Sequence, residues 1–389
     1  MDLRFSPDDE AFRAEVRSFL DTSLAGEFAA VRGSGGPGDE HALFDERRAW
    51  ERHLAANGWT CVGWPTEHGG SGLTLHQQVV FHEEYARAKG PGRLGHIGET
   101  LLGPTLIAFG TAAQRARFLP PILAATELWC QGYSEPDAGS DLASLSTRAV
   151  LDGDEWVIDG QKVWTSLAHS ADWCFVLART DREAPKHKGI SCLLVPMSAS
   201  GIEVRPIEQM TGGSEFNEVF FSGVRTAAAN VVGEVNGGWR VAMGTLAFER
   251  GTSTLGQVLQ FQNELDEIVA VARRRGLAAD PRVRQQLAAC WTRLRIMRWN
   301  ALRTIEGDRP ELAGAAMITK LYWATLHRDL GELAMAVLGP EGLVEEGGGL
   351  GALQRLFLFS RADTIYAGTN EIQRNIIGER AIHLPKEPA

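Results

Sequence analysis

Two short stretches of this sequence gather polar side chains that could bind a polar ligand. The first, WCQGYSEPDAGSDL from Trp129 to Leu142, combines hydroxyl groups, small-residue turns and many backbone donors. Such a loop can wrap a polar ligand, although Ser, Pro, Asp and Gly also make ordinary surface connectors. The second, QKVWTSLAHSADW, ends a predicted strand with Trp164-Thr165-Ser166, so an aromatic side chain stands beside two hydroxyls. Taken alone, a strand end explains that pattern at least as well as a ring-binding site does.

A third stretch places an acidic residue at the end of an apolar stripe. In GGWRVAMGTLAFERG, the apolar residues Trp239, Ala242 and Leu246 recur at helical spacing, and Glu249 follows three residues later. This spacing predicts that the Glu249 carboxylate faces inward. From the residues alone, an ion pair with Arg250 or Arg240 explains this acid better than a catalytic role does, because charges at the edge of an apolar stripe usually reach solvent.

The stretch TIYAGTNEIQRN, Thr364 to Asn375, raises the question of which residue would accept a proton if the chemistry removed one from carbon. Its turn, Tyr366-Ala367-Gly368, offers neither an acid nor a base. Thr369 and Glu371 begin the helix that is predicted to follow the turn, and helix N-termini favour phosphate groups.

The elements that must position these residues fall into three regions. Up to about Ala125 apolar residues recur at spacings of three and four, which predicts helices. The segment RAVLDGDEWVIDGQKVWTS then predicts three short strands, joined at Asp152-Gly153 and at Asp159-Gly160. Further strand-like runs follow and predict a compact, mostly antiparallel sheet or barrel.

After Gly237 the helical pattern returns and continues to about Ile382. Glycine and proline predict breaks in it. These breaks fall at 276–281, 307–310, 339–351 and 366–368. We therefore expect a helical domain over 1–125, a β-domain over 126–236 and a second helical domain over 237–389.

Composition excludes several classes of protein. The 389 residues are 44% hydrophobic and can bury a large core, while a formal charge of −10 argues against binding to nucleic acid. The five cysteines have no CxxC spacing and the ten histidines no HExxH motif, so we expect neither a disulfide framework nor a metal site. The N-terminus lacks the features of a signal peptide, and no stretch reaches the roughly 18 apolar residues of a membrane span. These features predict a cytoplasmic protein.

Two glycine-rich segments match the dinucleotide-binding pattern as written. They are Gly33-x-Gly35-x-x-Gly38 and Gly347-x-Gly349-x-x-Ala352. Neither follows a credible strand within a strand–helix–strand unit, so the structural context that gives the motif its function is missing. We interpret both as flexible loops.

The two polar stretches together resemble the flavin-contacting stretches of the acyl-CoA dehydrogenase family, and further matches follow in the family's order. These are WPTEHGGSGLT at 64–74, FGTAAQRARFLPPIL at 109–123, DGQKVWTS, KGISCLLVP, FNEVFF, FERG at 248–251 and IYAGTNEIQR. The resemblance covers nearly the whole chain. It implies a mainly α fold with a central β-domain, placed between an N-terminal helical domain and a C-terminal four-helix bundle.

The resemblance also implies a non-covalent FAD and an acyl-CoA substrate, whose Cα–Cβ bond is oxidised to a trans-2-enoyl thioester. It places Gln131, Tyr133 and Ser134 near the flavin ring, and Ser140 near the cofactor phosphates and the substrate. Trp164, Thr165 and Ser166 are placed along the opposite edge of the ring. Thr369 and Glu371 are expected to meet the adenosine portion of FAD or the FAD of a neighbouring subunit.

The family commonly carries its catalytic glutamate immediately before the Gly-Thr of the turn, where this chain has Ala367. A subset resembling isovaleryl- and long-chain acyl-CoA dehydrogenases supplies the base from an earlier helix, and the matching residue is Glu249. The resemblance then leaves the backbone N–H of Ala367 and a flavin ribityl hydroxyl to bind the thioester carbonyl. Arg250 and Gly368 are expected to contact the substrate.

Some family features are absent. The segment VARRRGLAADPRVRQ keeps arginines, among them Arg273, but lacks the phenylalanine of the family's Arg-x-x-Phe-Gly segment, and a cationic helix end alone explains these arginines. The glutamine that often precedes the later Gly-Gly turn is also missing.

We expect electrons to pass to an electron-transfer flavoprotein. We also expect the chain to form either a homotetramer or a mixed tetramer with a related chain. The alternatives are an acyl-CoA oxidase, a flavin monooxygenase, or a non-catalytic subunit of such a mixed tetramer.

Overall fold

The computed structural model describes residues 4–36, 38–249, 253–305, 312–345 and 349–385. Their contacts divide them into two compact units. The helical unit takes its residues from 1–33, 74–90 and 252–389, and the sheet unit from 34–73 and 91–251. The segment 1–125 thus contributes to both units.

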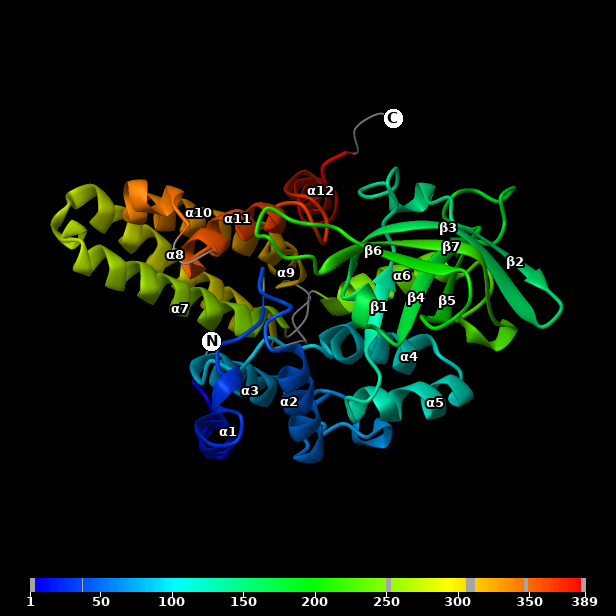
Figure 1. The fold of residues 1–389 in the computed structure, drawn as a ribbon, viewed down its shortest axis with the longest axis horizontal. Helices are drawn as coiled ribbons and strands as arrows, with labels where there is room; N and C mark the ends of the chain where they lie inside the picture. The colour runs from blue at the N-terminus through cyan, green and yellow to red at the C-terminus, as the bar shows by residue number, and fades with distance from the viewer. Residues whose placement is uncertain (1–3, 37, 250–252, 306–311, 346–348, 386–389) are drawn as a thin grey trace. The chain divides into compact units, whose positions relative to one another are not determined.

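The helical unit is built from helices at both ends of the chain (Figure 1). They are α1 (Pro7–Ala25), α3 (Leu75–Arg87), α7 (Ser253–Arg274), α8 (Pro281–Ile305), α9 (Ala313–Met317), α10 (Thr319–Leu338), α11 (Ala352–Asp363) and α12 (Asn370–Ile376). Buried side chains such as Phe261, Leu294 and Leu330 form its core. The predicted breaks at 276–281, 339–351 and 366–368 are confirmed, whereas 307–310 lies outside the described residues.

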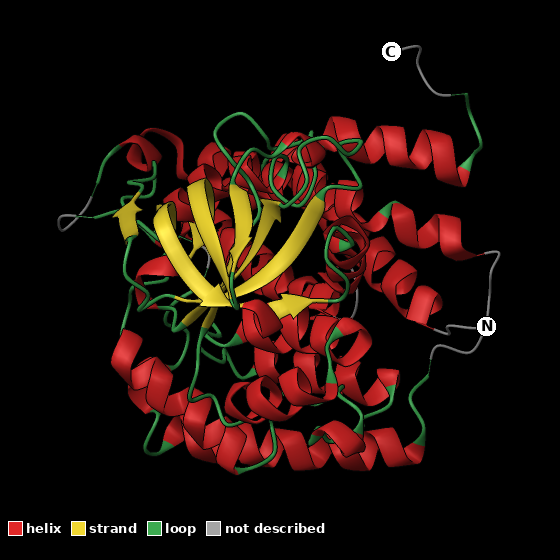
Figure 2. Cartoon of the chain, turned by 90° about the vertical axis from the view of Figure 1, so that its right-hand side faces the viewer, coloured by secondary structure: helices red, strands yellow, loops and turns green. Residues whose placement is uncertain are grey.

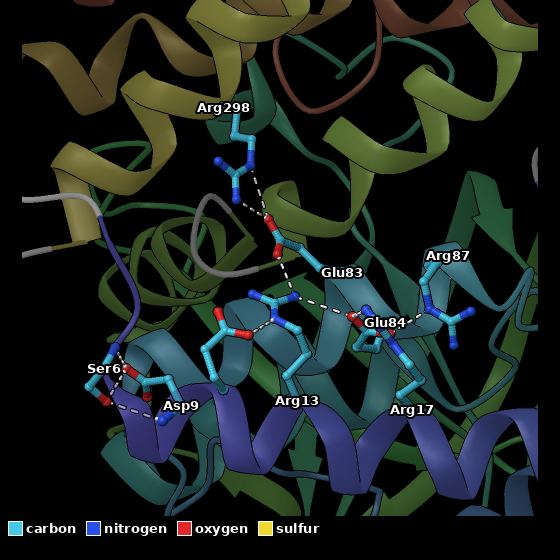
Figure 3. A network of polar contacts seen from close by, with 9 residues as sticks. Ser6, Asp9, Arg13, Arg17, Glu83, Glu84, Arg87 and Arg298 are labelled. Carbon is cyan, nitrogen blue, oxygen red and sulfur yellow. Dashed lines mark hydrogen bonds and ion pairs between the residues drawn. The ribbon is translucent and has the colours of Figure 1, made fainter.

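A network of charged side chains joins α1, α3 and α8 within the helical unit (Figure 3). Arg17 and Arg87 donate to the buried carboxylate of Glu84, and Arg13 bridges Glu83 and Glu84. Burial opposes ionisation of Glu84, but the three arginines outweigh it and lower the pKa of its carboxyl group to about 2.

The network reaches α8 through Arg298, whose guanidinium donates to Glu83 at 2.9 and 3.1 Å. Helices from the two ends of the chain are therefore connected by charge as well as by apolar contact. A capping box starts α1, in which Ser6 and Asp9 exchange hydrogen bonds between side chain and backbone.

The sheet unit contains one twisted sheet (Figure 2). Its strand order is β6-β7-β3-β2-β4-β5-β8, with β1 pairing to β4. Its strands are β1 (Trp129–Gly132), β2 (Arg148–Asp152), β3 (Glu155–Ser166), β4 (Trp173–Arg179), β5 (Ile190–Pro196), β6 (Ile202–Pro206), β7 (Phe216–Ala227) and β8 (Val231–Val232). Most pairings are antiparallel, as predicted, although β1 and β2 both run parallel to β4.

Helices cover one face of this sheet. They are α4 (Gly103–Phe109), α5 (Ala112–Leu123), α6 (Gly238–Glu249) and a π-helical turn at Gly98–Leu102, and α2 (Phe44–Ala56) belongs to the same unit. Along β4, Phe175 and Leu177 belong to the same apolar cluster as α4 and α5, while Cys174 and Val176 belong to a second cluster with β7. The alternation of a strand thus buries β4 on both faces.

One predicted hairpin turn is wrong. Asp152-Gly153 does turn the chain between β2 and β3, but Asp159-Gly160 lies inside β3, where the pairing with β7 only shifts register. The glycine is required there because a Cβ at position 160 would stand 2.4 Å from the Thr147 hydroxyl oxygen. Gly160 therefore marks a close approach of two segments rather than a reversal of the chain.

Two further expectations concern absences. No helix within the described part of the chain is long and apolar enough to span a membrane. Helical elements precede and follow both glycine-rich segments in the described part of the chain, and Ala352 of the second segment begins α11, which agrees with the prediction that neither segment follows a strand.

We predict that Glu84→Gln lowers the free energy of unfolding by about 2 kcal/mol at pH 7, because a buried charged acceptor for three arginines is lost. The pKa of Glu84 is depressed in the folded state, so its contribution is complete above the ordinary value of 4.5 and disappears as the pH falls toward 2. Urea unfolding at pH 7 and pH 3 measures the difference.

Glu10→Gln is the matched control, since Glu10 also pairs with Arg13 but is 55% exposed in its side chain. We expect a change within about 0.5 kcal/mol for it. Equal losses for the two variants at pH 7 would contradict this account of the network.

Candidate functional site

A buried ion pair anchors the polar loop that follows β1. Lys162, on β3, is fully buried, and its ammonium donates to Glu135 at 2.8 Å and to the carbonyl of Tyr133 at 3.1 Å. Glu135 also accepts hydrogen bonds from the backbone and hydroxyl of Ser146 and from the backbone of Thr147. The carboxylate of Glu135 therefore accepts hydrogen bonds from three residues, Lys162, Ser146 and Thr147.

These donors decide the charge state of the pair. Burial opposes ionisation of Glu135, but Lys162 and the donors at 146 and 147 lower the pKa of its carboxyl group to about 2. Burial also lowers the pKa of Lys162, and the attraction of Glu135 counteracts this effect. We conclude that both groups are charged at neutral pH, because each is hydrogen-bonded as well as paired.

The loop residues named from the sequence lie beside this pair. Tyr133 is buried with its ring edge-on to Phe175, at a centroid distance of 5.6 Å. Ser134 is half-buried, and its carbonyl accepts from the Val163 amide at 2.9 Å. Ser140 is exposed further along the same loop. The structure therefore brings Tyr133 and Ser134 against β3 and leaves Ser140 on the surface.

The end of β3 presents an exposed aromatic side chain. The pairing with β7 shifts register between Lys162 and Thr165, and Trp164 within this irregularity has a φ of 59° and is 57% exposed. Its ring meets Phe216 edge-on at 6.1 Å. The irregularity turns Trp164 outward while its neighbour Thr165 stays buried.

Three buried side-chain polar atoms of β1 and β3 have no hydrogen-bond partner among the described residues. They are Nε1 of Trp129, Nε2 of Gln131 and the hydroxyl of Thr165. Ser166, next in the chain, is half-buried. An unpaired buried donor is costly, so such atoms favour a partner from outside the chain. These residues fit a polar ring system of the flavin type.

Helix α6, which leads to Glu249, is fixed closely to the sheet. Buried positions on it include Val241, Ala242 and Thr245, whose hydroxyl lies 2.9 Å from that of Thr105 on α4. Its first residue, Gly238, has no room for a side chain, because a Cβ there would stand 2.5 Å from the backbone of Ser191.

The predicted stripe on α6 is only partly correct. Ala242 is fully buried, but Trp239 and Leu246 are half-buried. Position 249 ends the helix four residues after Thr245, which continues the spacing of the buried face. The side chain of Glu249 and the whole of Arg250 lie outside what the structure describes.

The turn before α12 belongs to the helical unit and has an unusual backbone. Ala367 has a φ of 52° and Gly368 a φ of 88°, so two consecutive residues are left-handed. The carbonyl of Ala367 accepts from Nε2 of the buried Gln373 at 3.0 Å. Within the described residues its amide donates no hydrogen bond. The turn therefore offers a backbone donor and no side-chain acid.

Three further residues that were predicted to contact the cofactor belong to the helical unit. Thr369 caps α12 by accepting from the Ile372 amide at 3.2 Å, and Glu371 is exposed and pairs with Arg374. Arg273 is exposed in the last turn of α7.

In the described part of the chain, no group of three or more histidine, cysteine, aspartate or glutamate side chains is arranged to hold a metal ion.

Sequence reasoning missed the Lys162–Glu135 pair. A signal for it exists, because Lys162 occupies a buried position in the alternation of β3, where a charge requires a partner. The identity of that partner depends on the loop conformation, which sequence spacing does not reveal.

Comparisons with known proteins agree with this architecture. Family models of three acyl-CoA dehydrogenase domains match the chain. The N-terminal domain matches residues 6–126, the middle domain 130–224 and the C-terminal domain 236–382. The chain belongs to the acyl-CoA dehydrogenase family. Its relatives include acyl-CoA dehydrogenase IpdE1 of Mycobacterium tuberculosis, which is 60% identical over 98% of this chain and 99% of the relative. On this evidence the chain is an acyl-CoA dehydrogenase enzyme.

A second IpdE1, from Mycolicibacterium smegmatis, is 58% identical over 97% of this chain and 98% of its own length. Among solved structures, the Tcur3481–Tcur3483 steroid ACAD is 35% identical with a TM-score of 0.86, and each chain is covered completely. The ChsE4–ChsE5 complex from Mycobacterium tuberculosis is 32% identical with a TM-score of 0.83, again over both complete chains. These relatives are not isovaleryl- or long-chain enzymes, so the comparisons support the family but not the likeness to that subset.

We predict that Lys162→Met destabilises this acyl-CoA dehydrogenase by about 3 kcal/mol, because the Glu135 carboxylate stays buried without its cation. Lys186→Met is the control. Lys186 pairs with Asp141 at 2.9 Å, close to the 2.8 Å of the buried pair, but both side chains are at least half exposed. For it we expect a loss below about 1 kcal/mol. Urea unfolding measures both, and similar small losses would show that the buried pair does not anchor the loop.

Proposed function

We propose that this acyl-CoA dehydrogenase holds FAD, with Gln131, Tyr133, Ser134 and Ser166 as donors toward the flavin and Trp164 against its ring. The unpaired buried atoms of Gln131 and Thr165 support this assignment. When bound, FAD supplies the hydride acceptor of the reaction. Further residues are proposed, from the family resemblance, to contact the cofactor's phosphates and adenosine, and these are Ser140, Arg273, Thr369 and Glu371.

The proposed base is Glu249. The observation that carries this proposal is the turn at Ala367, which has a methyl group where the family commonly has its catalytic glutamate and keeps a backbone amide without an acceptor among the described residues. A proton acceptor must then come from another segment. Position 249 continues the spacing of the buried positions on α6, and burial would raise the pKa of a carboxyl group there toward neutrality.

The chain's own residues would divide the chemistry as follows. The thioester carbonyl accepts a hydrogen bond from the Ala367 amide, which stabilises the negative charge that develops on its oxygen and acidifies the Cα hydrogen. Glu249 takes that proton as the Cβ hydride leaves, and the electron pair of the Cα–H bond forms the new double bond. Gly368 and Arg250 are proposed to contact the substrate beside these groups.

We predict that Glu249→Gln slows flavin reduction by acyl-CoA about 100- to 10,000-fold, because the substitution keeps size and polarity but removes the base. Binding of FAD and acyl-CoA should stay near that of the wild type. Anaerobic stopped-flow absorbance measures reduction, and isothermal titration measures binding.

The double variant Glu249→Gln with Ala367→Glu tests whether the two positions serve one Cα hydrogen. Returning a carboxylate to position 367 should restore part of the rate. A wild-type rate of flavin reduction in Glu249→Gln alone, with a substrate that the wild type oxidises, would place the base elsewhere.

We predict that Ser166→Ala weakens FAD binding or slows flavin reduction by about five- to tenfold, the contribution of one hydrogen bond, without loss of folding stability. The matched control is Ser191→Ala. The Ser191 hydroxyl bonds within the protein, to Thr180 at 2.7 Å and to the Asn236 amide at 2.8 Å, so its loss should lower stability and leave FAD affinity unchanged. The reverse pattern would overturn the assignment of Ser166.

We further propose a polycyclic, steroid-derived acyl group as the substrate and a mixed assembly with a related chain as the functional form. The support is likeness to the Tcur3481–Tcur3483 steroid ACAD and to the ChsE4–ChsE5 complex, each of which is named for two different chains. An electron-transfer flavoprotein is the proposed acceptor of the electrons.

The decisive experiment is an anaerobic titration of the purified protein, alone and co-expressed with candidate partner chains, with straight-chain, branched and polycyclic acyl-CoAs. Bleaching of bound FAD by the polycyclic thioester, followed by reoxidation with an electron-transfer flavoprotein, is the expected result. Rapid peroxide formation in air would indicate an oxidase instead. Failure of this chain to retain FAD in any assembly would indicate a non-catalytic subunit.

A further inference from the structure

A buried histidine joins three helices of the helical unit at one point. His327, in the middle of α10, is 3% exposed, and its Nε2 lies 2.9 Å from a carboxylate oxygen of Glu264 on α7. Its Nδ1 bonds to Asp363, the last residue of α11. The imidazole also stacks on Phe261, with ring centroids 4.0 Å apart and planes within 12°. Both ring nitrogens and one ring face are therefore engaged.

The two carboxylates determine the protonation state of this ring. A carboxylate can only accept, so two of them require a proton on each ring nitrogen, which is the imidazolium form. Burial opposes that charge, but Glu264 and Asp363 outweigh it and raise the pKa of His327 to about 10. His327 is therefore a buried cation at neutral pH.

The chain of hydrogen bonds continues from His327 into the turn before α12. One oxygen of the Asp363 carboxylate faces His327, and the other accepts the hydroxyl of Tyr366 at 2.5 Å. The Tyr366 amide donates to the Ala362 carbonyl at 3.0 Å. Tyr366 is thus fixed at its backbone and at the tip of its side chain, although 37% of it is exposed.

A second cation supports the same contact. The buried ammonium of Lys320, on α10, donates to the Asp363 carbonyl and lies 5.5 Å from the centre of the Tyr366 ring. It also lies 5.3 Å from the ring of Trp323. Asp363 and Tyr366 are therefore held together from two sides, directly before the left-handed residue Ala367.

Stability alone does not account for a buried cation at position 327. The neighbouring buried positions of α10, such as Leu326, Leu330 and Leu333, are filled by apolar side chains that pack the bundle. Replacing a buried ion pair by apolar groups of similar volume is commonly neutral or stabilising, so packing would be served as well without charge. What apolar residues cannot supply is a directional link that ends at Tyr366.

The turn itself needs such a link. A left-handed φ at alanine costs about 1 kcal/mol and persists only where the surroundings hold it. Gln373 holds the carbonyl of Ala367 from the α12 side. The His327–Asp363–Tyr366 chain holds the residue that precedes Ala367. Together they fix the peptide between Tyr366 and Ala367, which carries the Ala367 amide.

We propose that His327 is a positioning residue of this enzyme, which acts through Asp363 and the Tyr366 hydroxyl to hold the Ala367 amide in place for the substrate's thioester carbonyl. This inference rests on the proposed function, since it assigns a task to the amide named there. His327 itself touches neither the substrate nor the reacting atoms.

Tyr366→Phe tests the link with the smallest change, because it removes only the hydroxyl that bonds Asp363. We expect the maximal rate of flavin reduction by the best acyl-CoA to fall about tenfold with little change in KM, since a carbonyl contact of this kind strengthens in the transition state. Tyr322→Phe is the matched control. Its hydroxyl also bonds within the bundle, to the Arg293 carbonyl at 3.2 Å, and its loss should leave both constants unchanged.

A readout without substrate separates this inference from the proposed function. Amide hydrogen exchange reports the turn directly, because the amides of Ile365, Tyr366 and Asn370 donate to carbonyls within residues 362–364. We expect these three amides to exchange faster in Tyr366→Phe and at wild-type rates in Tyr322→Phe. If the wild type oxidises no acyl-CoA, the proposed function fails while the exchange comparison still decides the positioning role.

Substitutions at Glu264, the partner of His327 Nε2, separate the contribution of the histidine. Glu264→Gln keeps the His327–Asp363 contact, so we expect lower thermal stability but unchanged turn exchange and unchanged reduction rate. His327→Gln combined with Glu264→Gln removes the cation without leaving the Glu264 charge buried, and the turn amides should then exchange faster.

Two results would overturn the proposal. If Tyr366→Phe behaves as Tyr322→Phe does in every measurement, the hydrogen-bond chain only stabilises the bundle. Alternatively, Glu264→Gln could loosen the turn as much as Tyr366→Phe, which would mean that the coupling does not run through Asp363. Should the double variant at 264 and 327 not fold, these two single variants still decide the question.

Discussion

The fully buried ammonium of Lys162 is the constraint on which the polar loop of the sheet unit depends. A charge in the interior without a counter-charge costs several kcal/mol, so an acid must lie within reach. Glu135 meets this need, and because it also collects donors at residues 146 and 147, it fixes the loop at both ends. The backbone of Tyr133 and Ser134 is then held along β3. The orientation of the candidate flavin donors follows from one electrostatic requirement.

The helical unit also has a buried cation beside a loop, but this cation is paired with two carboxylates in place of one. There the buried cation is an imidazolium between two carboxylates, and the segment that it restrains is the turn after α11. Apolar contacts fill the cores of both units but are interchangeable and weakly directional. Hydrogen-bonded charges have a required direction, so each unit uses a small number of them where a loop must keep one conformation.

Much of this architecture could be predicted from the sequence. Helical spacing and strand-like runs predicted the order helices, sheet, helices, and the breaks near 276, 339 and 366 follow glycine and proline where the structure ends its helices. The exception at Asp159-Gly160 is instructive. The same dipeptide that makes a hairpin turn at 152–153 here lies within one strand, because the glycine is needed for the approach of Thr147. Local sequence alone does not distinguish these two uses of glycine.

The site was predictable in kind rather than in detail. Hydroxyls and an aromatic side chain led to the prediction of a loop and a strand end as the flavin site, and the structure adds unpaired buried atoms at Gln131 and Thr165. The partners Lys162–Glu135 and His327–Asp363 are 27 and 36 residues apart, and nothing in their spacing pairs them. Such contacts depend on tertiary structure, so a sequence reading identifies a charged residue in an apolar pattern but not the group that satisfies it.

Alanine at position 367 separates two tasks that the family commonly combines in one short turn. A proton acceptor is a property of a side chain, and it is lost with the carboxylate. A hydrogen bond to the thioester carbonyl, in contrast, comes from the backbone, so any residue that adopts the left-handed conformation retains it. In this chain that conformation is held by neighbours on both sides, Gln373 after the turn and Tyr366 before it. The base can therefore lie on another helix, as proposed for Glu249, while the turn keeps the backbone amide that is proposed to bind the carbonyl.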